Sequence, residues 1–309
     1  ISYFFISQFI LDLNKKMYTT YSDYMRQFFS ERIQKIAVTA GFSCPNRDGK
    51  VGVGGCIFCN NKSFTPDYCL HGESITEQIE KGLKFFAHKP EYKKFIVYFQ
   101  AFSNTYGTLE EIKSRYEEAL SHPNVVGLSI GTRPDCLPDE VLDYIAELSK
   151  KYFILLEIGV ESIHDKTLKL INRGHDYKTA EDAIFRAYKR GIRTAVHFIL
   201  GLPSETRADI LETAHKIASL PIDVVKLHQL QIIKNTALAD LYEKDPASVP
   251  LFTLDEYLDL CAEIVKIIPK RICIERFVSQ SPPELRLAPN WGVKNYEFVH
   301  KLRKRIGAE

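Results

Sequence analysis

The 309-residue chain has few of the features that mark membrane-spanning, secreted or strongly basic proteins. Lys and Arg number 41 against 39 Asp and Glu, so the sequence has no global basic field, and a nucleic-acid partner would need a local patch. No apolar run reaches the length of a membrane span. We therefore predict a cytoplasmic protein with no membrane partner.

The sequence also lacks a secretory signature at its apolar opening. The run ISYFFISQFILDL has no basic residue before it, contains Asp12, and is followed by no Ala-x-Ala-type cleavage site. Met17 is a plausible natural start. We expect residues 1–16 to be an N-terminal extension and not a signal peptide.

A disulfide framework is missing too. The seven cysteines are odd in number and belong to a large chain, and both facts argue against a secreted, disulfide-stapled fold. Three of them, Cys44, Cys56 and Cys59, lie close together in the sequence. This clustering indicates a metal site.

What the sequence does contain is a repeated strand–helix rhythm. Strands buried on both faces are predicted at 33–39, 95–100, 125–130, 153–160, 194–200 and 224–230. Helical spacing of apolar residues separates them at 74–87, 109–120, 139–150, 179–190 and 207–220. A Rossmann sheet is the alternative arrangement, but the G-x-G-x-x-G motif that it uses is absent after the first strand.

We therefore predict an α/β fold, a partial (β/α)6 TIM-type barrel over residues 17–250. The segment 251–309 holds a helical pattern at 254–268, a strand-like run at 271–277 and a basic helix at 293–306. No linker precedes this segment, so we expect it to form a C-terminal cap packed on the same domain.

The three clustered cysteines follow the pattern C-x11-C-x2-C. Three thiolates from one loop can hold three irons of a [4Fe–4S] cubane and leave the fourth iron open to a ligand. Glycines between them allow the backbone to wrap a bulky cluster. The alternative is a structural zinc loop with Cys69 or His71 as the fourth ligand, although a second Cys-x2-Cys pair is missing.

The segments Gly41–Gly49 and Gly54–Asn60 resemble the cluster loop of the YhcC/YtqA family of radical S-adenosylmethionine (SAM) proteins, which are relatives of the Elongator catalytic subunit. Further family-like motifs follow at the predicted strand ends: Phe99–Tyr106, Gly131–Asp135, Glu157–Ser162, Asn172–His175, Gly201–Thr206 and Lys226–Gln231. The ends of strands are where barrels place their chemistry.

The resemblance implies that Cys44, Cys56 and Cys59 bind a [4Fe–4S] cluster that cleaves SAM to a 5′-deoxyadenosyl radical. It implies that Phe58 lies by the adenine, that Gln100, Ala101 and Ser103 belong to the segment that bonds the amino group of SAM, and that Glu161 lies near its ribose or methionine end. Arg173 would hold the carboxylate of SAM, and Gly201 would let the backbone approach the adenine.

We assign Arg133, Asp135, His228 and Gln229 to substrate, because they face the predicted barrel mouth. His197 is interpreted as an ordinary interior residue, and Cys136 as a small buried one. The resemblance implies a one-electron donor such as flavodoxin or ferredoxin, and a tRNA substrate whose wobble 5-carboxymethylaminomethyluridine becomes 5-aminomethyluridine.

Two other functions stay open at the level of sequence. One is a radical SAM enzyme for a small metabolite or tetrapyrrole, and the other is a non-catalytic zinc-binding module. The terminal helix offers a basic face that could contact RNA phosphates, or that could be an ordinary solvated surface; its cations are Lys294, Lys301, Arg303, Lys304 and Arg305.

Overall fold

The computed structural model describes residues 16–69 and 73–307. The proposed extension therefore lies outside the described residues except for its last position, and so does His71. Within the described ranges, no helix combines the length and the apolar character that crossing a membrane requires.

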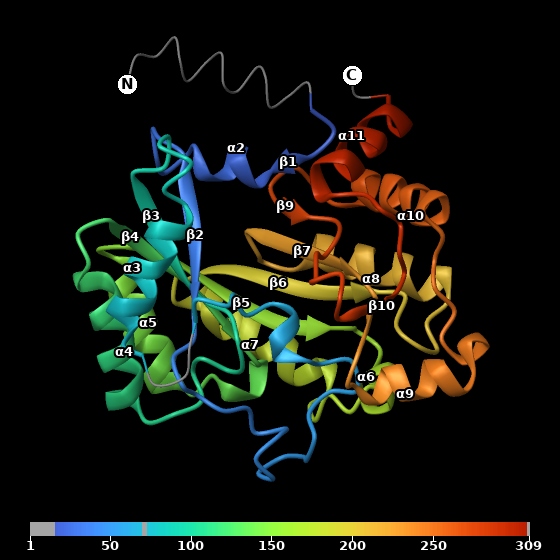
Figure 1. The fold of residues 1–309 in the computed structure, drawn as a ribbon, viewed down its shortest axis with the longest axis horizontal. Coiled ribbons are helices and arrows are strands. Elements are labelled where there is room, and N and C mark those ends of the chain that lie inside the picture. The colour runs from blue at the N-terminus through green and yellow to red at the C-terminus, as the bar shows by residue number, and fades with distance from the viewer. Residues whose placement is uncertain (1–15, 70–72, 308–309) are drawn as a thin grey trace.

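One parallel sheet of eight strands forms the centre of the molecule (Figure 1). In spatial order its strands are β2 (Ile33–Val38), β3 (Lys94–Phe99), β4 (Val125–Thr132), β5 (Phe153–Glu161), β6 (Arg193–Leu200), β7 (Val224–Gln229), β9 (Cys273–Arg276) and β1 (Thr19–Thr20). The six predicted strands are thus confirmed. Their sequential order contains no point where the order reverses, which separates this sheet from the Rossmann alternative.

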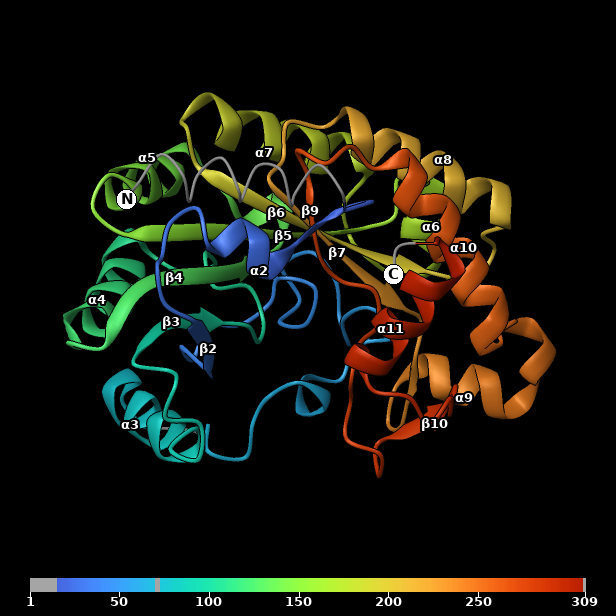
Figure 2. The same cartoon turned by 90° about the horizontal axis from the view of Figure 1, so that it is seen from above.

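The strand sequences explain why the sheet is covered on its outer face. β4 and β5 are buried along nearly their whole length, as expected for parallel strands that have other elements on both faces. Figure 2 shows the helices as an outer arc around the curled sheet, with the loop that follows β2 on the inner, concave side. The fold is an open half-barrel, as predicted.

The helices have the bounds expected from their apolar spacing and caps. They are α2 (Tyr21–Met25), α3 (Ile75–Phe85), α4 (Leu109–Ser121), α5 (Asp139–Ser149), α6 (Asp165–Leu170), α7 (Tyr177–Lys189), α8 (Arg207–Ser219), α9 (Ala237–Lys244), α10 (Leu254–Ile267) and α11 (Asn295–Arg305). Capping boxes define several starts: Ser74 and Glu77 at α3 bond reciprocally, and so do Thr206 and Asp209 at α8.

The C-terminal segment does more than cover the barrel. Its strand β9 pairs in parallel with β7 and with the short strand β1, so residues from this segment extend the sheet itself. A second, two-stranded sheet pairs β8 (Ile232–Ile233) with β10 (Arg286–Ala288). The segment 251–309 therefore supplies side chains to the inner face of the half-barrel, and the boundary near residue 250 stays a prediction.

Candidate functional site

The concave side of the sheet encloses a cavity of about 730 Å³. Its walls come from the loop after β2, from the C-terminal ends of several strands and from the segment after β9. Ligand sites commonly have volumes of about 300–1,000 Å³, and barrel enzymes place theirs at this end of the strands. This cavity is the candidate site.

The three predicted metal ligands all line the cavity. Cys44, Cys56 and Cys59 are free thiols, and their loop is held by its own backbone. The Gly55 N–H donates to the Asn46 carbonyl at 2.8 Å, and the Cys59 N–H donates to the Cys56 carbonyl at 3.0 Å. Gly55 has φ +84°, and a Cβ there would lie 2.9 Å from Arg47 Nε, so the close turn requires glycine.

The spacing of the thiols bears on which metal group fits them. Sulfurs bound to one tetrahedral zinc lie about 3.8 Å apart, since each Zn–S bond is about 2.3 Å. Among the described residues, three ligand atoms from His, Cys, Asp or Glu come within 4.8 Å of one another only at His164, Asp209 and Glu212, away from the cysteines. The three thiols are too widely spaced for one small ion, and this spacing favours a larger cluster.

Cys56 has two nitrogen donors next to its sulfur. Asn46 Nδ2 lies 3.7 Å and Arg173 Nη1 3.5 Å from Cys56 Sγ. Arg173 Nη2 also donates to the Gly159 carbonyl at 2.6 Å and lies 3.4 Å from Glu161 Oε1. Burial lowers the pKa of Arg173, but the neighbouring Cys56 and Glu161 outweigh it and raise that pKa overall. A cation is thus fixed against the sulfur of a predicted ligand.

The same corner leaves polar atoms without partners. Arg173 Nε and Asn46 Oδ1 are buried and have no hydrogen-bond partner within the described part of the chain. Burial raises the pKa of Glu161 against the opposing effect of Arg173. Glu161 also has φ +69°, a strained value for a residue with a side chain. Unpaired donors and a strained carboxylate fit a polar cofactor that binds beside the thiols.

Four of the predicted cofactor residues line the cavity: Phe58, Gln100, Glu161 and Arg173. Ala101 and Ser103 are buried behind Gln100, and the Ser103 N–H donates to the Ser43 carbonyl of the cysteine loop at 3.2 Å.

Gly201 does not line the cavity, and a Cβ at that position would face the Phe252 ring at 3.0 Å. The positive φ of Gly201, +89°, explains the need for glycine without any ligand. The cofactor roles stay predictions.

The residues assigned to substrate are more strongly held by the protein than predicted. Arg133 lines the cavity but bonds both carboxylate oxygens of Asp135, at 2.9 and 2.8 Å, and the Arg173 carbonyl at 2.8 Å. Asp135 is not in the cavity wall. The pair therefore supports Arg173 from behind.

Gln229 also lines the cavity, but both ends of its amide are engaged with the Ser279 backbone. His228 lines the cavity as well and contacts Arg276 and Ser279. Of the four assignments, His228 belongs to a larger group of polar side chains.

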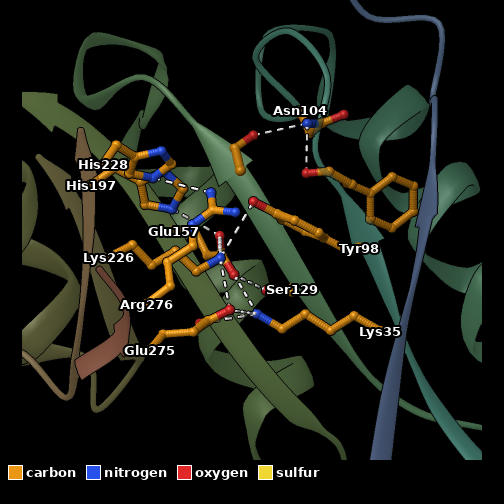
Figure 3. A network of polar contacts seen from close by, with 12 residues as sticks. Lys35, Tyr98, Asn104, Ser129, Glu157, His197, Lys226, His228, Glu275 and Arg276 are labelled. Atoms are coloured by element: carbon orange, nitrogen blue, oxygen red, sulfur yellow. Dashed lines mark hydrogen bonds and ion pairs between the residues drawn. The ribbon is translucent and has the colours of Figure 1, made fainter. Parts of the chain in front are cut away.

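That group was missed by the sequence reasoning. Seven charged or histidine side chains meet inside the half-barrel (Figure 3): Lys35, Glu157, His197, Lys226, His228, Glu275 and Arg276. His197 Nε2 lies 2.9 Å from Glu157 Oε2. Its interpretation as an ordinary interior residue understates a position in the cavity wall. Charged residues inside otherwise apolar strands were the available signal.

Comparison with known proteins identifies the family. Residues 44–217 match the Radical SAM superfamily, and residues 222–307 match the Radical_SAM C-terminal domain. The chain is 35% identical over 292 residues to "Uncharacterized protein YtqA" of Bacillus subtilis, covering 94% of this chain and 90% of that protein. It is 35% identical over 282 residues to "Protein YhcC" of Escherichia coli, covering 90% and 88%.

A solved structure shares the fold. The archaeal Methanocaldococcus infernus Elp3 superimposes with a TM-score of 0.66 at 16% identity, over 90% of this chain and 64% of that one. Proteins of the superfamily use a [4Fe–4S] cluster and SAM, and the three-thiol loop beside unpaired polar atoms fits both. From these matches and the half-barrel, the chain belongs to the radical SAM superfamily, among the relatives of YtqA and YhcC.

Proposed function

We propose that this protein is a tRNA-modifying radical SAM enzyme that converts wobble 5-carboxymethylaminomethyluridine to 5-aminomethyluridine. The observation that carries the proposal is a three-thiol loop that opens onto one polar cavity of about 730 Å³. Its support for this substrate is the Elp3-like fold together with the similarity to YtqA and YhcC.

In this proposal Cys44, Cys56 and Cys59 hold the cluster, and Arg173 and Glu161 orient SAM beside it. The two cofactors, when bound, supply a radical able to abstract a hydrogen atom from substrate. Arg173 suits a carboxylate because its guanidinium can donate two parallel hydrogen bonds and its Nε has no other partner in the described structure. Glu161 accepts hydrogen bonds from hydroxyl groups.

The protein's further proposed tasks are to admit the substrate and an electron. Phe58 and Gln100 lie in the cavity wall, where they would contact the adenine and amino ends of SAM. A one-electron donor such as flavodoxin or ferredoxin would reduce the cluster, and a tRNA substrate places the enzyme in the cytoplasm.

The basic C-terminal helix supports RNA binding less than its composition predicts. Arg305 pairs with Asp255 at 2.9 Å and with Asp259 at 2.7 Å, both on α10. Its charge therefore fastens α11 to the protein. A tRNA contact on this helix would have to use its other cations, which include Lys294 and Lys301.

The test is mass spectrometry of tRNA nucleosides from cells that lack the protein, complemented with the wild type or with Cys56→Ala. We expect 5-carboxymethylaminomethyluridine to accumulate without the protein and to disappear only with the wild type. Unchanged nucleosides, together with no tRNA binding by the purified protein at low salt, would contradict the proposed substrate.

A further inference from the structure

The charges inside the half-barrel are unevenly paired, and this is the starting point. Lys35 lies 3.0 Å from Glu157 and 2.9 Å from Glu275. Lys226 also pairs with both carboxylates, with Glu157 at very short range and with Glu275 at 3.2 Å. These two lysines and two glutamates neutralise one another, as the crossing dashed lines in Figure 3 show.

Arg276 is the charged member left outside this ring. It lies on β9, where the pairing with β7 shifts register between Val225 and Lys226, so that Lys226 stands opposite Arg276. Such a bulge lets consecutive residues share one side of a strand. Glu275 and Arg276 accordingly both line the cavity, although neighbours on a regular strand point to opposite faces.

Arg276 has no anionic partner. No carboxylate of the described chain forms an ion pair with it, and its Nε is buried without a hydrogen-bond partner. Its one printed side-chain contact runs from Nη2 to His228 Nε2 at 3.1 Å. A cavity-lining guanidinium that lacks an anion is costly unless a ligand supplies one.

His228 does not neutralise that charge, and its hydrogen bonds fix its tautomer. Arginine only donates, so His228 Nε2 must accept from Arg276 and carry no proton. His228 Nδ1 then carries the proton and donates to Ser279 Oγ at 2.6 Å. Burial and the neighbouring Arg276 hold the pKa of His228 well below its usual range. The neutral ring, stacked on His197 at 5.2 Å, orients the guanidinium without removing its charge.

We propose that Arg276, positioned by His228, binds the carboxylate of the substrate inside the half-barrel. Arg173 stands against Cys56, beside the predicted cluster ligands, whereas Arg276 lies on a strand near the other edge of the sheet. The two arginines would therefore bind two different anions, one on the cofactor and one on the substrate. The carboxylate rests on the proposed function, in which the uridine side chain carries one; an RNA phosphate offers the same bidentate chemistry.

The experiment measures binding of nucleoside probes to the cluster-loaded holoenzyme by calorimetry. The probes are 5-carboxymethylaminomethyluridine, its neutral primary amide, and uridine 3′-monophosphate. We expect the wild type to bind the carboxylate about 10- to 100-fold more tightly than the amide. Arg276→Gln should abolish this preference, and Arg276→Lys should keep part of it because the charge remains.

The matched control is Arg286→Gln. Arg286 lies on β10, bonds Asn290 at 3.2 Å and does not line the cavity, so this variant should keep the wild-type preference. Equal binding of carboxylate and amide by the wild type overturns the proposal, even if Arg276→Gln loses its iron and cannot be compared. An Arg276-dependent preference for the monophosphate alone overturns the carboxylate assignment. Carboxylate preference without conversion of tRNA would leave this site standing and remove the proposed function.

Discussion

Two polar regions meet in the cavity, and they differ in how fully the protein satisfies them. Beside the cysteine loop, Arg173 Nε and Asn46 Oδ1 are buried without partners in the described structure. Deeper in the half-barrel, Lys35, Lys226 and Glu157 each have at least two oppositely charged neighbours. The difference teaches that the first region is built to receive a ligand, whereas the second is mainly built to hold the sheet together, with Arg276 as its open position.

The largest effect should come from removing a predicted cluster ligand. Cys56→Ala should abolish iron binding and SAM cleavage, because two thiolates no longer hold the cubane. Cys261→Ala is the control, since Cys261 is fully buried on α10 and outside the cavity. Iron analysis and product assay after anaerobic purification check both. Full cleavage by Cys56→Ala would refute the ligand assignment and with it the contrast between the regions.

Next in size is the loss of a buried cation from the paired ring. Lys226→Met should lower stability by about 3–5 kcal/mol, because Glu157 and Glu275 lose a partner while staying buried. Lys216→Met, which removes a partly exposed ion pair with Glu181, should cost at most about 1 kcal/mol. Thermal unfolding of the cluster-loaded variants compares them. Equal melting temperatures would mean that the ring does not stabilise the sheet.

A smaller effect is expected at the open cofactor corner. Arg173→Ala should weaken SAM binding about 10- to 100-fold and leave the iron content unchanged, because a charge-assisted pair of hydrogen bonds is lost. Arg207→Ala, which removes a surface pair with Glu263, is the control. Equilibrium binding of SAM and iron analysis are the measurements. Loss of iron would instead place Arg173 among the groups that support the cysteine loop.

How much of this was predictable follows from how each region is encoded. The six strands, the helix caps and the three-cysteine spacing are local patterns, so the sequence alone predicted the half-barrel and the metal loop. The charged ring joins Lys35 to Glu275, residues 240 positions apart, through the curl of the sheet. Arg276 faces the cavity because of a bulge that no local pattern announces. Neither could be read before the strands were placed.

The smallest expected effect is on the pH dependence of stability. Burial lowers the pKa of His197 to about 4, against the opposing bond to Glu157, and also holds that of His228 well below its usual range. Unfolded histidines bind protons near pH 6.5, whereas these two stay neutral in the folded chain. Stability should therefore fall as pH drops below about 6.5, by roughly 1.4 kcal/mol per pH unit for each histidine.

His197→Gln tests this, because it removes one of the two titrations while an amide can still bond Glu157. Melting temperatures between pH 7 and pH 5 should fall less steeply in the variant than in the wild type. Parallel slopes would show that His197 titrates in the folded protein as it does in the unfolded chain, and the interior would then be less sealed than the comparison requires.

The most direct test of the central claim is electron paramagnetic resonance of the anaerobic, reduced protein with and without SAM. Three thiolates and one open iron predict about four irons per chain and a cluster signal that changes when SAM is added. A sample that holds one zinc per chain, or a cluster signal that SAM leaves unchanged, would contradict the account.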